Sequence, residues 1–212
     1  MYRQSPSGFR PGTMPGVDLA ALLVGAFLLG GIPFAFLFAR IVKRVDIRET
    51  GSGNIGATNC ARLFPPRLRV AVFLSVFCLD AGKGFLASFV LPRLVEGVAL
   101  APTLAAAAAV LGHIFTPFLR FKGGKGVATT VGALLGLEPV STLFAVAAFL
   151  ALFAATRIVA IGSLGFALTL PPAIFLRGTA HPGVGILACA LAVLIVLRHR
   201  SNIAKLLGGA MQ

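Results

Sequence analysis

The sequence has 212 residues, of which 58% are hydrophobic and only 12% are charged, and its mean hydropathy is +0.96. About a quarter of the residues of a soluble domain are charged, so these values exclude a single soluble domain and indicate an integral membrane protein with several apolar helices. The net charge of +13 is better explained by basic loops that follow the positive-inside rule than by nucleic-acid binding, and we predict no nucleic-acid partner.

The chain begins with a polar stretch rich in Gly and Pro, residues 1–16, which we expect to be a flexible tail. A single domain is expected over residues 17–212. Its first apolar run, residues 17–42, is too long for the core of a signal peptide and predicts a retained membrane span. The cysteines show no metal-type spacing and no natural pairing, so we expect small apolar side chains without a disulfide. They are Cys60, Cys78 and Cys189.

Apolar length predicts further helices, at residues 70–92, 97–115, 127–156, 158–176 and 182–197. As one helix, the run 127–156 would be about 45 Å long, against a hydrocarbon thickness of about 30 Å. Glu138 and Pro139 also lie at its middle, where a charge would be unsatisfied in a bilayer. We therefore expect a hairpin of two helices, residues 127–137 and 139–156. The predicted fold is an all-α integral membrane protein with about seven membrane-embedded helices.

The distribution of positive charge favours seven helices over six. With the N-terminus outside and the C-terminus cytoplasmic, fourteen of the 19 lysines and arginines lie inside and four lie outside. A six-helix model moves the basic cluster at residues 198–205 to the outside, against the positive-inside rule. With seven helices, three polar segments reach the cytoplasmic face, where they could build one site.

The first polar segment, ETGSGNIGATNCAR at residues 49–62, contains the spacing G-x-G-x-x-G at Gly51, Gly53 and Gly56. A dinucleotide-binding fold needs this spacing within a βαβ unit, which the surrounding apolar helices exclude. The glycines still allow backbone N–H groups to approach an anion, and Arg62 adds a cation suited to phosphate or carboxylate. The alternative is a flexible loop in which Gly and Asn only make turns. The neutral donors are Ser52, Asn54, Thr58 and Asn59.

The second polar segment, RFKGGKGVATT at residues 120–130, is similar to a P-loop but lacks its pattern. Leu119 stands where the first glycine belongs and Gly126 follows Lys125, so we expect no ATP hydrolysis. Glycines before a helix would still form an amide nest at a helix N-terminus, which binds phosphate, with Lys125 as a point charge. The positive-inside rule explains the lysines but not these glycines, which are Gly123, Gly124 and Gly126.

The third polar segment, RHRSNIAKLLGG at residues 198–209, has His199 and Asn202 three residues apart, so on a helix they share one face. We predict that this pair belongs to a site; the alternative is a structural histidine. His113 in GHIFTPF is a further candidate, and His181 in an outer turn has no predicted role. The six acids form no close pair and no cluster has metal-ligand spacing, so we predict no metal and no cofactor.

Together these segments resemble the bacterial acyl-phosphate:glycerol-3-phosphate acyltransferase (PlsY) family over essentially the whole chain after the N-terminal tail. The motifs that carry the resemblance are, in order, GSGNIGATN..R, D..KG, GH.F..FL.FKGGKGVAT and HR.NI..LL.G. The resemblance implies a multi-pass, monomeric enzyme of the inner membrane with its active site facing the cytoplasm. It would transfer an acyl group from acyl phosphate to the 1-hydroxyl of glycerol 3-phosphate, giving lysophosphatidic acid and phosphate in the first step of phospholipid synthesis.

The resemblance also implies functional residues, by position. The implied catalytic residues are Ser52, Arg62, Lys125, His199 and Asn202. The implied phosphate contacts are Thr58, Gly123, Gly124, Gly126 and Ser163, and with the candidates from the residues themselves the predicted substrate-binding set also includes Gly53, Asn54, Asn59 and His113. The chain departs from the family in two places: Met211 stands where the third motif usually ends in Glu, and FTPF lacks a proline directly after the first phenylalanine.

An acyl phosphate is already activated, so positioning and charge neutralisation could supply most of the catalysis. The base is either His199 or a phosphate oxygen of the substrate, and we favour the substrate. The competing class is a transporter of organic phosphates, which would share the basic loops and the many spans. Transporters place their sites near the midplane between internal repeats, and the sequence has no such repeat.

Overall fold

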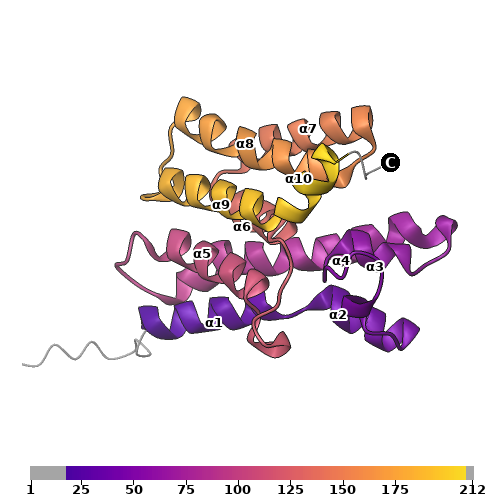
Figure 1. Cartoon of the computed structure of the whole chain (residues 1–212). Helices are drawn as coiled ribbons and strands as arrows, with labels where there is room; N and C mark the ends of the chain where they lie inside the picture. Colours follow the sequence, from indigo (N-terminus) through magenta and orange to yellow (C-terminus); the bar gives the residue numbers. More distant parts are fainter. Residues whose placement is uncertain (1–17, 209–212) are drawn as a thin grey trace, which may run out of the picture.

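The computed structural model describes residues 18–208, and every element within that range is helical (Figure 1). The longer helices are α1 (Leu19–Gly31), α4 (Pro66–Phe85), α5 (Ala101–Ile114), α6 (Val127–Leu137), α7 (Pro139–Thr156), α8 (Val159–Arg177) and α9 (Val184–Arg198). The short ones are α2 (Phe34–Phe38), α3 (Ala57–Arg62), α10 (Arg200–Leu207), η1 (Ala39–Lys43), η2 (Ile47–Glu49), η3 (Leu86–Val90), η4 (Leu91–Leu94) and η5 (Pro117–Leu119). The predicted tail and Met211 lie outside the described residues.

The predicted break at the middle of the longest apolar run is confirmed. α6 ends at Leu137 and α7 begins at Pro139. Proline has no N–H to donate and its fixed φ suits the first turn of a helix, so it starts α7 without a lost hydrogen bond. Glu138 between the two helices accepts a hydrogen bond from the Thr179 hydroxyl. The carboxylate therefore lies beside the turn after α8.

The first predicted span, residues 17–42, corresponds to one apolar helical stretch, Leu19–Lys43, which is interrupted near its middle. α1 ends at Gly31 and α2 begins after Pro33, because proline cannot continue the hydrogen-bond ladder of α1. Two side chains donate to carbonyl groups at this break: the Thr116 hydroxyl to Gly31 at 2.6 Å and Lys83 Nζ to Ile32 at 2.8 Å. Backbone carbonyls in apolar surroundings need such partners, so the break is built into the fold rather than frayed.

Small residues bring the long helices into close contact. A Cβ added at Gly30 of α1 would overlap the backbone of Ala109 in α5, and one at Gly132 of α6 would overlap the carbonyl of Ala81 in α4. Close backbone approach through small residues is the usual way in which membrane helices pack. α6 contacts α4, α5, α7 and α9, and lies between the α1–α4–α5 group and the α7–α8–α9 group (Figure 1).

The outer surface is apolar, as expected of a bundle surrounded by lipid. Leu176 is 87% exposed, Ile186 77% and Ile41 75%. Within residues 18–208, five helical stretches are long and apolar enough to cross a membrane, the first being Leu19–Lys43, and α9 with α10 makes a sixth candidate, bent by 55° between the two. α6 has 11 residues and would be about 16 Å long, too short to cross alone. The chain is therefore an all-helical, multi-pass membrane protein, and the count of seven embedded helices stays a prediction.

The three cysteines are free, as predicted: Cys60 is buried, and Cys78 and Cys189 are exposed.

Candidate active site

The three polar segments meet at one cavity of about 440 Å³. The first segment enters it through the loop before α3, the second through the start of α6, and the third through the bend between α9 and α10. A smaller cavity of about 300 Å³ adjoins it, because both are lined by Ser52, Asn54, Lys125, Asn202 and Lys205. Segments that are more than 130 residues apart in the sequence therefore form one site.

All the site residues predicted from the sequence except Gly124 line one of the two cavities. The larger is lined by Ser52, Asn54, Thr58, Asn59, Arg62, His113, Lys125, Gly126, Ser163, His199 and Asn202. Gly53 and Gly123 line the smaller one. The structure thus brings the predicted residues together, while their individual roles stay predictions.

The first segment is held in shape by Asn59. Its side-chain amide donates to the carbonyls of Ile47, Thr50 and Asn54 at 3.2, 3.0 and 3.1 Å, and its Oδ1 accepts the N–H of Ser52 at 3.1 Å. Because these bonds use the whole side-chain amide, Asn59 organises the loop that presents Ser52. Asn59 is buried, whereas Ser52 is exposed to the cavity.

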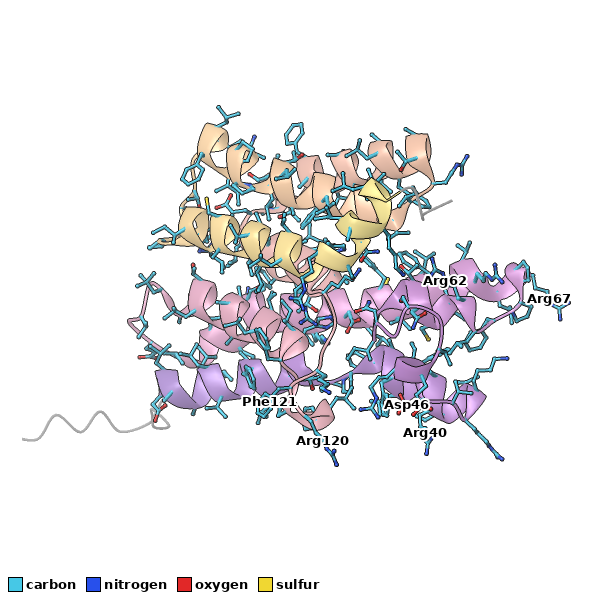
Figure 2. All side chains as sticks on the ribbon, viewed as in Figure 1. Arg40, Asp46, Arg62, Arg67, Arg120 and Phe121 are labelled. Atoms are coloured by element: carbon cyan, nitrogen blue, oxygen red, sulfur yellow. The ribbon has the colours of Figure 1, made fainter. Side chains whose placement is uncertain are left out.

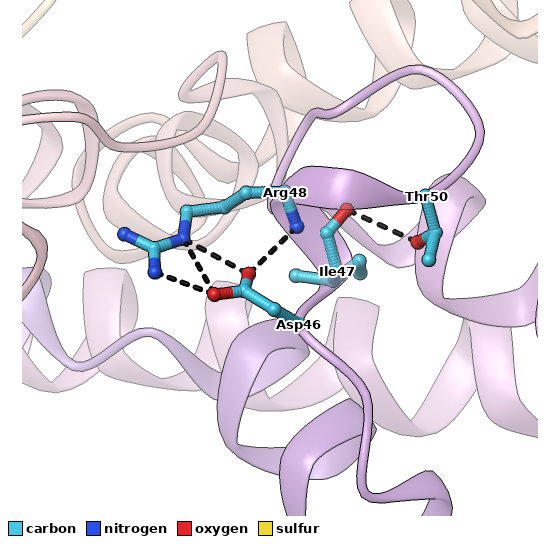
Figure 3. A network of polar contacts seen from close by, with 4 residues as sticks. All are labelled: Asp46, Ile47, Arg48 and Thr50. Carbon is cyan, nitrogen blue, oxygen red and sulfur yellow. Dashed lines mark hydrogen bonds and ion pairs between the residues drawn. The ribbon is translucent and has the colours of Figure 1, made fainter.

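An ion pair fixes the chain just before this loop. Asp46 accepts hydrogen bonds from the backbone N–H of Arg48 and from its guanidinium, the shortest at 2.5 Å (Figure 3). These hydrogen bonds lower the pKa of the Asp46 carboxyl to about 2. Thr50 also donates to the carbonyl of Ile47, which begins η2. The turn that leads into the glycine-rich stretch is therefore held by the Asp46–Arg48 contacts and by the hydrogen bond from Thr50 to Ile47.

Arg62 is the last residue of α3 and lines the larger cavity. Figure 2 shows it where α3 lies beside α4, whereas Arg67 lies farther out along the first turn of α4. Arg120 and Phe121 lie in the loop between α5 and α6, at the lower edge of the molecule in this view. Arg62 therefore lines the site, whereas Arg67 and Arg120 line neither cavity.

The second segment packs its glycines against the end of α5. The N–H of Gly123 donates to the Ile114 carbonyl at 3.0 Å and that of Gly124 to the His113 carbonyl at 3.1 Å. A Cβ at Gly124 would overlap Nε2 of the His113 ring, so Gly124 lies behind the cavity wall. Gly126 has φ +89°, a conformation that favours glycine, and it starts α6.

Lys125 lies between these glycines and faces the third segment, where its Nζ donates to Oδ1 of Asn202. Burial, with further contributions from Arg198 and Lys205, lowers the pKa of the Lys125 ammonium to about 8. A lysine with that pKa is charged at neutral pH but close to losing its proton. Among residues 18–208 no carboxylate pairs with Lys125, so its charge is available to an anion.

His199 lies at the bend between α9 and α10, and is buried. Its Nδ1 is 2.8 Å from the Ile195 carbonyl. A carbonyl can only accept, so Nδ1 carries the hydrogen, and Nε2 of the neutral ring is an acceptor. Burial and the nearby Lys125 ammonium lower the pKa of His199 to about 4. The histidine is therefore neutral at pH 7 and a weak base.

Residues that were not predicted as part of the site also line the larger cavity. Phe73 and Phe77 of α4 and Phe149 of α7 form an apolar part of its wall. Asp80 of α4 lies in the wall too, and its Oδ1 is 2.7 Å from Lys83 Nζ. The signal for this pair was present in the sequence, because charges within an apolar span are costly and are usually functional or paired.

The charge of the larger cavity suits an anion. Its wall contains Arg62, Lys125, Arg157 and Lys205, and within the described residues its one acid, Asp80, is paired with Lys83. The N-terminus of α6 adds backbone N–H groups and the positive end of a helix dipole. Fold and site together define a membrane-embedded helical protein that can hold a phosphate-bearing ligand beside an apolar wall.

The comparisons with known proteins identify the family. Residues 20–209 match the family model described as glycerol-3-phosphate acyltransferase. Curated glycerol-3-phosphate acyltransferases are similar throughout: that of Maridesulfovibrio salexigens is 41% identical over 187 residues, covering 88% of this chain and 92% of the relative. That of Syntrophomonas wolfei is 42% identical over 193 residues, covering 90% and 94%. The chain belongs to the glycerol-3-phosphate acyltransferase (PlsY) family and is an acyltransferase.

Two solved structures share the fold. One is a crystal structure of PlsY, an integral membrane glycerol 3-phosphate acyltransferase, in its glycerol 3-phosphate form; the TM-score is 0.82 at 35% identity, with 92% of this chain and 94% of that chain covered. The other is the lysophosphatidic acid form of PlsY, with a TM-score of 0.80 and the same identity.

Proposed function

We propose that this protein transfers a fatty acyl group from acyl phosphate to the 1-hydroxyl of glycerol 3-phosphate, giving lysophosphatidic acid and phosphate. The observation that carries the proposal is the convergence of the three polar segments on one cation-rich cavity with an apolar wall. Phosphate groups suit the cations and the start of α6, and an acyl tail suits the phenylalanines of α4 and α7. The related PlsY structures hold glycerol 3-phosphate in one form and lysophosphatidic acid in the other.

The reaction needs little covalent help from the protein. The 1-hydroxyl oxygen attacks the acyl carbon, the bond from that carbon to the phosphate oxygen breaks, and the hydroxyl proton must go to an acceptor. Ser52, Arg62 and the Lys125–Asn202 pair would hold the two substrates and neutralise the charge of the departing phosphate. An acyl-enzyme is not needed, because the mixed anhydride is already activated.

We propose that a phosphate oxygen of the acyl phosphate accepts the proton. With a pKa of about 4, the His199 ring is a weak base at neutral pH. A phosphate monoester has a second pKa of about 6, closer to neutrality, which matches the task better. His199 Nε2, as an acceptor, would then orient the attacking hydroxyl by a hydrogen bond, with Asn202 beside it.

We further propose a monomer in the bacterial inner membrane with the N-terminus outside, seven embedded helices and the site facing the cytoplasm. This reaction would be the first step of phospholipid synthesis. The distribution of basic residues supports this orientation, because the basic clusters of all three polar segments then lie inside. A single domain over residues 17–212 is part of the same proposal.

The decisive experiment uses protein purified in detergent. We expect it to form lysophosphatidic acid from acyl phosphate and glycerol 3-phosphate. We expect none when acyl-CoA or acylated acyl carrier protein replaces acyl phosphate. The matched controls are Arg62→Ala, expected to be inactive, and Arg67→Ala, whose side chain points away from the site and which should keep wild-type activity. Transfer from acyl-CoA alone would reject the proposed donor.

A further inference from the structure

Arg198, the last residue of α9, makes contacts that its place in a basic cluster did not suggest. Its Nη2 donates to the carbonyl of Gly123 at 3.0 Å and to the carbonyl of Gly124 at 3.1 Å. We propose that Arg198 is a positioning residue that sets the phosphate-binding geometry of the Gly123–Gly124–Lys125 turn. The inference rests on the proposed function only in taking the ligand to be the phosphate of glycerol 3-phosphate.

The peptide group between Gly123 and Gly124 is held at both ends. In a trans peptide the C=O and the N–H point in opposite directions. Arg198 holds the carbonyl end of this group, and the N–H end donates to the His113 carbonyl at 3.1 Å. One peptide group is therefore fixed at both ends, by α9 on one side and by α5 on the other.

The next peptide group, between Gly124 and Lys125, is held only at its carbonyl end, again by Arg198. Within residues 18–208 the N–H of Lys125 makes no hydrogen bond to the protein. It points away from the guanidinium, because the peptide is trans. A backbone N–H without a protein partner needs another acceptor, and a phosphate oxygen supplies one. Arg198 thus directs the free donor beside Lys125.

The turn is held from two sides, and without Arg198 it would be held from one side only. On the opposite side the His113 ring occupies the space in which a Cβ of Gly124 would lie, and the Gly123 N–H is bonded to Ile114. The guanidinium also places a positive charge behind the carbonyls and polarises the N–H groups in front of them. Arg198 comes directly before His199, so the same helix end sets both the phosphate turn and the histidine.

Binding of glycerol 3-phosphate, measured by calorimetry on the detergent-purified protein, tests the inference without an acyl donor. We expect Arg198→Gln to raise Kd about tenfold or more, since two hydrogen bonds from a charged donor are lost. Arg198→Lys keeps a charged donor and should restore most of the affinity. The control is Lys122→Gln, which removes the same charge from an exposed side chain near the turn and should change Kd less than about twofold.

A double-mutant cycle separates positioning from direct contact. If Arg198 acts through the turn, Arg198→Gln should have little further effect in Gly124→Ala, where the turn is already displaced by the clash with His113. Equal losses in both backgrounds would mean that Arg198 touches the substrate itself, and would overturn the inference. A Kd for Arg198→Gln within twofold of wild type would also overturn the inference.

Thermal unfolding of each variant shows whether it is folded. If Arg198→Gln is not, the lysine variant decides: near-native Kd supports positioning, and a hundredfold loss in a folded protein rejects it.

Failure of this inference is distinguishable from failure of the proposed function. Wild-type protein that binds glycerol 3-phosphate but forms no lysophosphatidic acid would reject the function and leave the role of Arg198 in binding intact. Wild-type protein that does not bind glycerol 3-phosphate would overturn both.

Discussion

At the scale of single residues, the site combines a lysine that is easily deprotonated with a histidine that is hard to protonate. Both shifts have the same main cause, since burial disfavours the charged form of each side chain. At neutral pH the pair is therefore a cation beside a neutral acceptor. That arrangement suits a dianionic substrate that carries its own proton acceptor.

From the pKa of Lys125 we predict that the binding of glycerol 3-phosphate weakens at basic pH. Below its pKa of about 8 the side chain is charged and binds phosphate; as the pH rises through that value the charge and the binding are lost. We expect KM for glycerol 3-phosphate to rise above pH 8 while kcat changes less, because bound phosphate raises the pKa of the lysine. Lys125→Arg, which stays charged at all these pH values, should give a KM that is constant from pH 7 to 9. The same rise in the arginine variant would assign the limit to another group.

If His199 only orients the substrate, its substitutions should lower activity to different degrees and not abolish it. His199→Asn keeps a hydrogen-bonding side chain at the bend and should retain measurable activity, whereas His199→Ala should lose more. The pH–rate profile of His199→Asn should keep the acidic limb of the wild type, because we assign that limb to the substrate phosphate. If the limb disappears in the asparagine variant, or if the two variants are equally inactive, His199 is the base.

At the scale of elements, α4 carries a buried ion pair that ties three helices together. The side chains of Asp80 and Lys83 are 3% and 1% exposed and lie 2.7 Å apart, one turn from each other on α4. Lys83 also donates to the Ile32 carbonyl at the break between α1 and α2. His113 of α5 approaches the same carboxylate oxygen, with its Nδ1 3.6 Å from Oδ1 of Asp80. The pair therefore joins α4 to the first helix and to α5 at the wall of the larger cavity.

This ion pair predicts that removing Lys83 lowers stability and that also removing the charge of Asp80 restores part of it. Lys83→Met leaves the Asp80 carboxylate buried without its cation and should cost about 3–5 kcal/mol. Asp80→Asn added to Lys83→Met removes the orphaned charge and should recover part of that loss. Thermal unfolding in detergent measures both, with Lys43→Met as a control for loss of an exposed lysine. A double variant no more stable than Lys83→Met would show that the charge of Asp80 is not the cause.

At the scale of the whole molecule, the arrangement makes sense only if all three polar segments face one side of the membrane. Ser52, Lys125 and Asn202 line the same two cavities, although Ser52 follows α1, Lys125 follows α5 and Asn202 follows α9 in the chain. Since α6 is too short to cross alone, the hairpin at Glu138 decides on which side the chain continues. The sidedness of the C-terminus is therefore the sharpest test of the seven-helix arrangement.

Cysteine accessibility in cells tests it directly. Single cysteines at Ser52, Lys122 and Ser201, in a cysteine-free background, should resist a membrane-impermeant thiol reagent in intact cells and react once the membrane is opened. The background is practicable because the chain has three cysteines and none is in a disulfide. Labelling of Ser201→Cys in intact cells would reject a cytoplasmic C-terminus and with it the hairpin as an embedded pair.

The amino-acid sequence by itself determined the class of the protein and most of its helix positions. Long apolar runs must become helices in lipid, and Pro139 ends one helix and starts the next wherever the chain is placed. The motifs also indicated the family and the residues of the site, since chemistry that handles phosphate needs glycines, cations and neutral donors close together. These properties are local, so they can be recognised in a few consecutive residues.

Only the tertiary structure decided how those residues are held. Asn59 donates to carbonyls of its own loop, and Lys83 donates to the Ile32 carbonyl after α1. Arg198 donates to glycine carbonyls of the second segment. The residue types alone did not indicate these partners. A side chain of Arg or Asn has the same donors in a substrate site and in a structural one. The partner with which such a side chain bonds depends on how the whole bundle packs, and no single segment of the sequence determines that packing.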